Sequence, residues 1–172
     1  MARAPLSLKA RAIGLLAQRE QSRAELRRKL LRIEQQQRAR LAAESGREGA
    51  DLAAEPEAQD AEANESVVDA LLDALAADGY LDETRFVESR LHLRASRFGA
   101  QRIQQELAQH GLKLDAEQQA ALRATELERA REVWQKRFGT EPPRDAVEQA
   151  RQTRFLLARG FAPEVVRRLL RA

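Results

Sequence analysis

The stretch DGYLDETRF, residues 78–86, decides the fold because it joins two segments that both have the composition of α-helices. Gly79 suits the left-handed backbone conformation that ends many helices, and Asp82 is a good N-cap for a helix that follows. The stretch therefore predicts a joint between helical units. Three bulky side chains are expected there, two wedged between the units and the third opening the apolar face of the next helix: Tyr80, Leu81 and Phe86.

The rest of the chain, on both sides of this joint, also has the composition of a helical protein. Ala, Leu, Glu, Gln and Arg, which are strong helix formers, dominate the chain. No segment shows the sustained alternation of Val, Ile and Thr that a strand would have. Hydrophobic residues make up 43% and charged residues 33% of the 172 residues, and there is no cysteine. Disulfides and thiolate metal sites are thereby excluded, and a reducing compartment is favoured.

The first apolar stretch of the chain does not resemble a targeting or membrane segment. Lys9, Arg11 and Arg19 lie inside or beside it, which is unlike the continuous apolar core of a secretory signal. No apolar run approaches the roughly 20 residues that span a bilayer. These features predict a cytoplasmic protein that does not enter the membrane.

Charge is distributed unevenly along the chain, although the net charge is only +3. Residues 1–33 carry +7 and residues 126–172 carry +4, whereas residues 34–65 carry −6 and residues 66–125 carry −2. Two basic ends therefore flank an acidic stretch. Only four of the 30 basic residues are lysine, so nearly all of the positive charge is on planar guanidinium groups, which suit phosphate and carboxylate.

The acidic stretch over residues 34–65 lacks the signals of a packed segment. Its apolar residues are almost all alanine, and Gly46, Gly49 and Pro56 interrupt helical periodicity. Such a segment buries too little apolar surface to offset the entropy lost on ordering. We predict an acidic disordered insertion here, with only the first few residues extending the preceding helix.

Apolar spacing and capping residues predict nine short helices in the remainder. Ser22 with Glu25 three residues later forms a capping box, which specifies one helix start well. Pro163 occupies the first turn of the last helix, a preferred position for proline. The expected helices lie near residues 8–19, from 22 to about 33, and near 66–78, 82–96, 100–110, 115–123, 126–137, 144–159 and 163–171.

Internal similarity groups these helices into three repeats. SRFGAQRI (96–103) and KRFGTEPP (136–143) share RFG at a spacing of 40 residues, and ELAQHGL (106–112) and FLLARGF (155–161) share a helix end followed by glycine. Gly111 and Gly160 are thus expected to join helices as Gly79 does. The predicted organisation is residues 1–33 and 66–80 for repeat 1, 34–65 for the insertion, 81–124 for repeat 2 and 125–172 for repeat 3.

Catalytic and metal-binding motifs are missing from the sequence. His92 and His110 lie on separate predicted helices without the spacing of metal ligands, and the glycines form neither a phosphate-binding loop nor a GxGxxG motif. Carboxylates such as Asp82 and Glu83 fall at helix starts, where they act as caps. We therefore expect no enzyme activity, no metal and no cofactor.

Basic side chains gather on several predicted helices. Arg90, Arg94 and Arg97 recur at i, i+4 and i+7 on the helix that follows residue 82, within its apolar arc. Such faces suit a phosphate backbone or an acidic protein groove, whereas a solvated surface is the alternative for any single arginine. Aromatic residues for base stacking are scarce. The candidate contact residues are Arg27, Arg28, Arg90, Arg94, Arg97, Arg102, Arg167 and Arg168.

The run from residue 67 to residue 112 resembles the bacterial regulatory protein RecX family. That family has the pattern V..L...GYLDD..FA......R...G...I...L...G. The matching positions here are Gly79, Tyr80, Leu81, Asp82, Phe86, Arg94, Gly99, Ile103, Leu107 and Gly111. The helix SRAELRRKLL and the final RGFAPEVVRRLL fit the first and last units of the family. Glu83 departs from the second Asp of GYLDD, and the insertion over residues 34–65 is long.

The resemblance implies an all-α fold, an elongated right-handed array of three tandem three-helix repeats. It implies a non-enzymatic, monomeric regulator that binds the RecA–DNA filament in its groove and lowers ATP hydrolysis, strand exchange and co-protease activity. The setting would be recombination, DNA repair and the SOS response, with weak to moderate binding to single- and double-stranded DNA. Two other functions stay open from the residues alone: a helix-turn-helix protein that binds duplex DNA, and a protein–protein scaffold.

Overall fold

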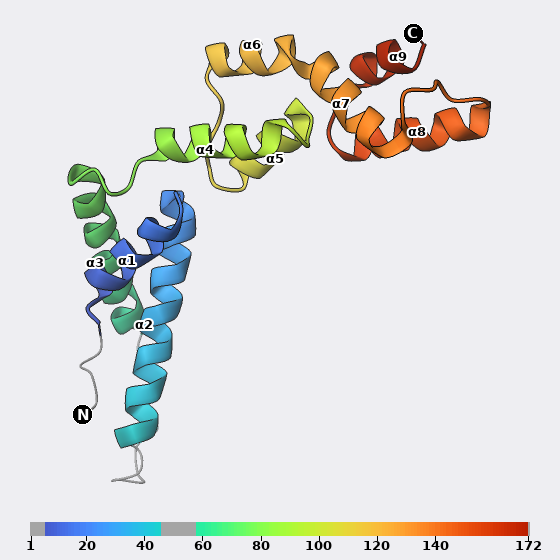
Figure 1. Cartoon of the computed structure of the whole chain (residues 1–172). Helices are drawn as coiled ribbons and strands as arrows, with labels where there is room; N and C mark the ends of the chain where they lie inside the picture. Colours follow the sequence, from blue (N-terminus) through green and yellow to red (C-terminus); the bar gives the residue numbers. More distant parts are fainter. Residues whose placement is uncertain (1–5, 46–57, 172) are drawn as a thin grey trace. The chain divides into compact units, whose positions relative to one another are not determined.

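The computed structural model describes residues 6–45 and 58–171, and within these ranges it contains nine helices and no strands (Figure 1). The all-α prediction is therefore confirmed. The chain divides into two compact units, Met1–Phe86 and Val87–Ala172. The helices are α1 (Leu8–Gln18), α2 (Arg23–Ser45), α3 (Ala58–Ala77), α4 (Glu83–Ala95), α5 (Ala100–Ala108), α6 (Ala116–Ala124), α7 (Glu126–Phe138), α8 (Ala146–Ala158) and α9 (Pro163–Arg171).

The first unit is built around α2 and α3, which pack side by side and run in opposite directions (Figure 1). Helix α1 packs against α2. Apolar residues spaced three to four apart on each helix face the same core, where each buried leucine contributes about 2 kcal/mol. The buried members are Ala12, Leu26, Leu30, Val68, Leu72, Leu75 and Leu81.

The acidic segment over residues 34–65 is more helical than its composition predicted. The predicted extension of the preceding helix by the first few residues is confirmed, but α2 continues to Ser45 and α3 already begins at Ala58. The expectation of disorder is therefore wrong for the remainder of residues 34–45 and for residues 58–65. Extending an existing helix through Ala, Glu, Gln and Arg costs far less than nucleating one, and it needs no apolar face. The expected breakers Gly46, Gly49 and Pro56 lie outside the described residues.

A glycine with positive φ follows α3, α5 and α8. Gly79 has φ +75°, and its N–H donates to Ala76 O at 3.1 Å while the N–H of Tyr80 donates to Leu75 O at 2.9 Å. This pair of bonds is the Schellman closure that satisfies the last carbonyls of a helix. Gly111 and Gly160 have φ of +74° and +79° and support the same pattern of bonds, so the three helix ends predicted at glycine are confirmed.

The segment after Gly79 buries one of its two neighbouring bulky side chains. Tyr80 is 47% exposed, whereas Leu81 is 5% exposed and joins the first core. The expected wedge by Tyr80 is therefore wrong, because burying a phenol requires a partner for its hydroxyl and burying leucine does not. Asp82 caps α4 as predicted, since its Oδ1 accepts from the N–H groups of Thr84 at 2.8 Å and Arg85 at 3.1 Å.

Glu25 connects the end of α1 to the start of α2. Its backbone N–H donates to Ser22 Oγ at 3.1 Å, and its carboxylate accepts from Arg19, just beyond α1, and from Lys29 one turn further along α2. Burial opposes ionisation of this carboxyl, but the hydrogen bonds and positive charges of Arg19 and Lys29 outweigh it and lower the pKa of Glu25 to about 2.

This lowered pKa predicts a pH-dependent contribution to stability. Because the pKa of Glu25 is lower in the folded chain than in the unfolded chain, the contribution is complete above about pH 5 and is lost as the pH falls toward 2. We expect Glu25→Gln to reduce the free energy of unfolding by about 1 kcal/mol at neutral pH, with the difference disappearing in acid. Urea unfolding followed by circular dichroism across this range measures it. Glu62→Gln, at an exposed glutamate of α3, is the control; parallel pH curves for wild type and Glu25→Gln would contradict the prediction.

The second unit is built around α7, which packs against α6, α8 and α9. Trp134 lies in its core, and its indole Nε1 donates to the buried Gln152 Oε1 at 2.7 Å. The buried apolar members are Ala130, Val133, Trp134, Leu156, Phe161, Val166, Leu169 and Leu170. Because Trp134 is the only tryptophan of the chain, its fluorescence reports on this unit alone.

Within this unit, the turn before α5 and the turn before α9 touch through their backbones at Gly99 and Gly160, a contact that we call the glycine junction. The N–H of Gly99 donates to Arg159 O at 2.9 Å, and the N–H of Gln101 donates to Gly160 O at 3.2 Å. A β-carbon on either glycine would overlap backbone atoms across the junction. The junction therefore fixes the positions of the side chains on both turns.

A buried and a half-buried charged side chain of α7, Glu126 and Arg129, support the same turns. Glu126 is 4% exposed, and its Oε1 accepts from the N–H groups of Ala100 at 3.1 Å and Ala162 at 3.3 Å, at the starts of α5 and α9. Arg129 donates to carbonyl groups at the ends of α4 and α6. Each charge thus faces the helix end of opposite partial charge.

Candidate functional site

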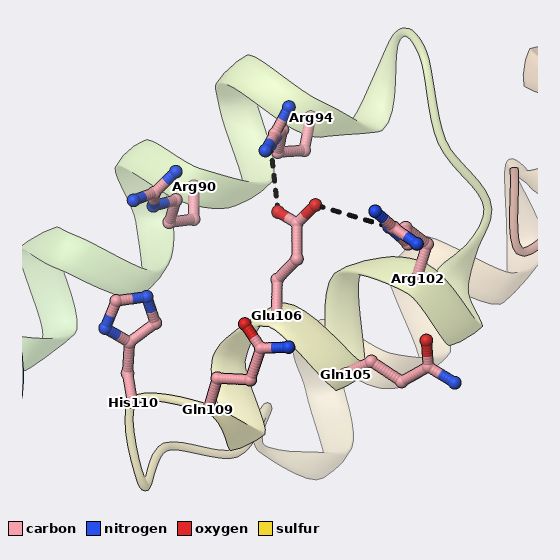
Figure 2. Close-up of a pocket in the computed structure, with 7 residues that line it drawn as sticks. All are labelled: Arg90, Arg94, Arg102, Gln105, Glu106, Gln109 and His110. Carbon is pink, nitrogen blue, oxygen red and sulfur yellow. Dashed lines mark hydrogen bonds and ion pairs between the residues drawn. The ribbon is translucent and has the colours of Figure 1, made fainter.

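Three of the predicted arginines converge on a cleft between α4 and α5 in the second unit (Figure 2). We call it the α4–α5 cleft, and its volume is about 360 Å³. The arginines come from one face of α4 and from the first turns of α5, where helical spacing places them toward each other. The lining residues are Arg90, Arg94, Arg102, Gln105, Glu106, Gln109 and His110.

A carboxylate at the centre of this cleft balances part of its positive charge. Glu106 Oε2 accepts from Arg94 Nε at 2.9 Å, and Glu106 Oε1 lies 3.6 Å from Arg102 Nε (Figure 2). The Glu106 side chain is 19% exposed, so these contacts are partly shielded from solvent. Arg94 also lies over the ring of Phe98, 5.0 Å from its centroid. The α4–α5 cleft can bind an anion, but the anion must compete with Glu106 for two of its guanidinium groups.

Arg97 lies in a different place from Arg90 and Arg94. Helix α4 ends at Ala95, so Arg97 belongs to the following turn and leaves the helical face on which its spacing had placed it. It lines a second cleft of about 290 Å³, which we call the cationic cleft. The lining residues are Ser96, Arg97, Val133, Lys136, Arg137, Phe155 and Arg159.

In the first unit, Arg27 is engaged by α3. Its Nε donates to Asp69 Oδ1 at 2.7 Å, and its Nη2 donates to Glu65 Oε2 at 2.8 Å. Hydrogen bonds with these two carboxylates raise the pKa of Arg27, and the bond to Arg27 lowers the pKa of Asp69. Arg28 is exposed, and its Nε donates to Ala24 O at 3.3 Å. The structure thus places Arg27 in an ion-pair network and leaves Arg28 on the surface.

The last predicted pair, Arg167 and Arg168, lies on the exposed side of α9. Neither residue lines the α4–α5 cleft or the cationic cleft. The eight predicted arginines therefore divide into one group of three, a single member of the cationic cleft, and four surface or ion-paired residues.

Three residues that matter at these clefts were not singled out from the sequence: Glu106, Lys136 and Arg137. The signal for two of them was present, because KRFG at 136–139 repeats the RFG that contains Arg97. Glu106 could not be found this way, since its partners are set by the packing of α5 against α4.

Within the ranges 6–45 and 58–171, metal-ligand clusters and membrane-spanning helices are both absent. No group of His, Asp or Glu side chains there could hold a metal ion. Among the described helices, none has both the length and the apolar character that crossing a bilayer would require.

The chain is similar to known proteins both in two three-helix ranges and over nearly its whole length. A family model described as the second three-helix domain of RecX matches residues 82–120, and one described as the third three-helix domain matches residues 124–170. The chain is 47% identical over 171 residues to the regulatory protein RecX of Leptothrix cholodnii, which covers 98% of this chain and 90% of the relative. The chain belongs to the RecX family. The resemblance found in the sequence is thereby confirmed.

Other RecX proteins show similarity over almost the whole chain. The regulatory protein RecX of Ralstonia nicotianae is 45% identical over 170 residues, covering 98% of this chain and 89% of the relative. That of Pseudomonas putida is 38% identical over 171 residues, covering 96% and 90%. The first matched range covers α4, α5 and the first half of α6, and the second covers α7, α8 and nearly all of α9, which fits a helical repeat array of three-helix domains.

Proposed function

We propose that this chain is a non-enzymatic regulator that binds RecA filaments and inhibits their ATPase, strand-exchange and co-protease activities. It would act in the cytoplasm as a monomer, in recombination, DNA repair and the SOS response. The observation that carries the proposal is similarity over nearly the full chain to proteins named regulatory protein RecX.

The electrostatics of the second unit support a charged partner. Two basic clefts lie on its surface, and basic surfaces are attracted to polyanions and to acidic protein grooves. A RecA filament on DNA would present the nucleic-acid polyanion and a protein groove in one assembly. Weak to moderate binding to single- and double-stranded DNA is part of the proposal.

The experiment that tests the proposal is a titration of this protein into RecA hydrolysing ATP on single-stranded DNA. We expect the ATPase rate to fall at amounts well below one regulator per RecA, which would favour action at filament ends or gaps. An unchanged rate across the titration would contradict the proposal. If naked duplex DNA were still bound with steep salt dependence and sequence preference, the alternative of a helix-turn-helix protein acting on duplex DNA would replace it.

A double replacement tests whether the two clefts contribute. Arg94→Ala with Arg97→Ala removes one guanidinium from each cleft, and we expect the protein concentration for half inhibition of the RecA ATPase to rise about tenfold. Arg131→Ala with Arg144→Ala is the matched control, because these arginines are ion-paired to Glu128 and Glu141 and line neither cleft. Circular dichroism establishes that both variants stay helical. Equal inhibition by the two variants would remove the clefts from the mechanism.

A further inference from the structure

The cationic cleft concentrates positive charge without any acidic side chain. Its four cations are Arg97, Lys136, Arg137 and Arg159, and its lining contains no Asp or Glu. They come from the turn after α4, the last turn of α7 and the end of α8, so three separate segments of the second unit bring them together. Like charges gathered in this way repel one another, a cost that a bound anion would remove.

This arrangement differs from that of the α4–α5 cleft and of several other arginines on the described surface. The α4–α5 cleft contains its own carboxylate, Glu106, and arginines elsewhere pair with acidic neighbours: Arg19, Arg23, Arg27, Arg85, Arg131 and Arg144. For the four cations of the cationic cleft, no ion pair forms within the part of the chain that the structure describes. Of the two clefts, the cationic cleft is therefore the one in which a negatively charged ligand meets no competing carboxylate.

Aromatic packing holds part of the cleft in position. The guanidinium carbon of Arg159 lies 4.3 Å from the centroid of the Phe155 ring, and Phe155 packs edge-to-face on Phe138 with centroids 5.1 Å apart. Stacking occupies the face of a guanidinium and leaves its N–H donors in the plane, at the edge. The glycine junction fixes the backbone of the same residue, because Arg159 O accepts from Gly99 N–H at 2.9 Å. The Arg159 donor fork is thus oriented before any ligand arrives.

We propose that the cationic cleft binds the phosphate backbone of a nucleic acid. The inference rests on the proposed action on a RecA–DNA filament, and it assigns the nucleic-acid strand of that filament to this cleft. A phosphate offers several oxygens to guanidinium forks and a lysine at once, whereas a single carboxylate is satisfied by one fork. Duplex DNA carries one negative charge per ~1.7 Å of its axis, which suits four cations in one cleft better than the sparser charge of a protein groove does.

The side chains of the cationic cleft also predict whether its binding to nucleic acid depends on base sequence. Val133 is buried and the ring of Phe155 is covered by Arg159, so the apolar surface is not presented as a platform for bases. Contacts made by guanidinium and ammonium groups to phosphate carry no sequence information. Binding at this cleft is therefore independent of base sequence.

The test compares Lys136→Gln with Arg137→Gln against the matched control Arg131→Gln with Arg144→Gln, both made in the full chain. Each pair lowers the net charge by two, but the control residues are ion-paired to Glu128 and Glu141. Fluorescence anisotropy with labelled single-stranded and duplex oligonucleotides of unrelated sequences measures affinity from about 50 to about 200 mM salt. We expect the cleft variant to bind about tenfold more weakly at low salt and to lose about two from the slope of log affinity against log salt, and the control to stay within about twofold.

Each outcome has a definite meaning. Equal losses in the two variants would show that only net charge matters, which would overturn the proposal. Unchanged DNA affinity with weakened RecA inhibition would assign the cleft to an acidic protein surface and would also overturn it. A wild-type protein that binds DNA through this cleft but leaves the RecA ATPase unchanged would sustain the phosphate site while contradicting the proposed function. Circular dichroism of each variant excludes unfolding as the cause of lost affinity.

Discussion

Replacing Gly99 with alanine is expected to lower the free energy of unfolding of the second unit by about 3 kcal/mol or more. The new β-carbon would overlap the carbonyl group of Gly160 and the backbone N of Phe161. Backbone atoms cannot swing aside as the end of a flexible side chain can. Separating the turns would also stretch the two hydrogen bonds of the glycine junction and the cap that Glu126 supplies to both helix starts.

Urea unfolding followed by Trp134 fluorescence measures this effect in the unit where it occurs. Gly14→Ala is the matched control, because Gly14 lies within α1 and has open space where a β-carbon would go. Alanine is the better helix former by about 1 kcal/mol, so circular dichroism is expected to show this control unfolding no earlier than the wild type. A Gly99→Ala protein within about 0.5 kcal/mol of the wild type would contradict the tight junction.

The glycines show which parts of the fold could be predicted from local chemistry. Gly79, Gly111 and Gly160 are each followed by a large apolar residue and preceded by a helical run, and this pattern indicates a left-handed helix end without any knowledge of the fold. The role of Gly99 depends on a backbone far along the chain, so its sequence neighbours carry no sign of the close approach. A repeated RFG marks it as part of a motif but gives no reason for the glycine.

The candidate site likewise contains features that local sequence predicts and features that only tertiary packing determines. Helical spacing placed Arg90 and Arg94 on one face correctly, since both lie within α4. The same spacing misplaced Arg97, because α4 ends at Ala95 and Arg97 lies in the turn that follows, where it lines another cleft. The ion pair that neutralises Arg94 could not be predicted from the sequence either, because Glu106 lies on α5 and is brought to Arg94 only by tertiary packing.

Replacing Arg129 with methionine is expected to lower the free energy of unfolding of the second unit by about 3 kcal/mol, again measured by Trp134 fluorescence in urea. Arg129 donates to the carbonyl oxygens of Ala95 at 2.9 Å, Phe98 at 2.8 Å and Leu122 at 2.7 Å. Burial lowers the pKa of this guanidinium. Methionine fills a similar volume but donates nothing, so the first two of these carbonyl groups would lose this donor and Leu122 O would keep only the longer bond from Thr125 Oγ1 at 3.4 Å.

Two further variants separate this role from charge alone. Arg131→Met, on the same helix, removes one positive charge that is exposed and paired with Glu128, and we expect it to change stability by less than about 0.5 kcal/mol. Arg129→Lys keeps the charge but loses the planar fork, and it is expected to fall between the wild type and Arg129→Met. Equal stability of Arg129→Met and Arg131→Met would contradict the structural role.

The same variants distinguish the two uses that this chain makes of arginine. Arg129 lines neither cleft, so under conditions in which Arg129→Met is folded, its affinity for DNA is expected to match that of Arg131→Met. The variant Lys136→Gln with Arg137→Gln is expected to behave in the opposite way. Its affinity for DNA falls while its free energy of unfolding stays unchanged. Arginine-rich composition alone cannot distinguish an arginine that donates to the carbonyl groups of helix ends from one that binds phosphate. The two differ only in whether carbonyl oxygens or solvent lie at the edge of the guanidinium group.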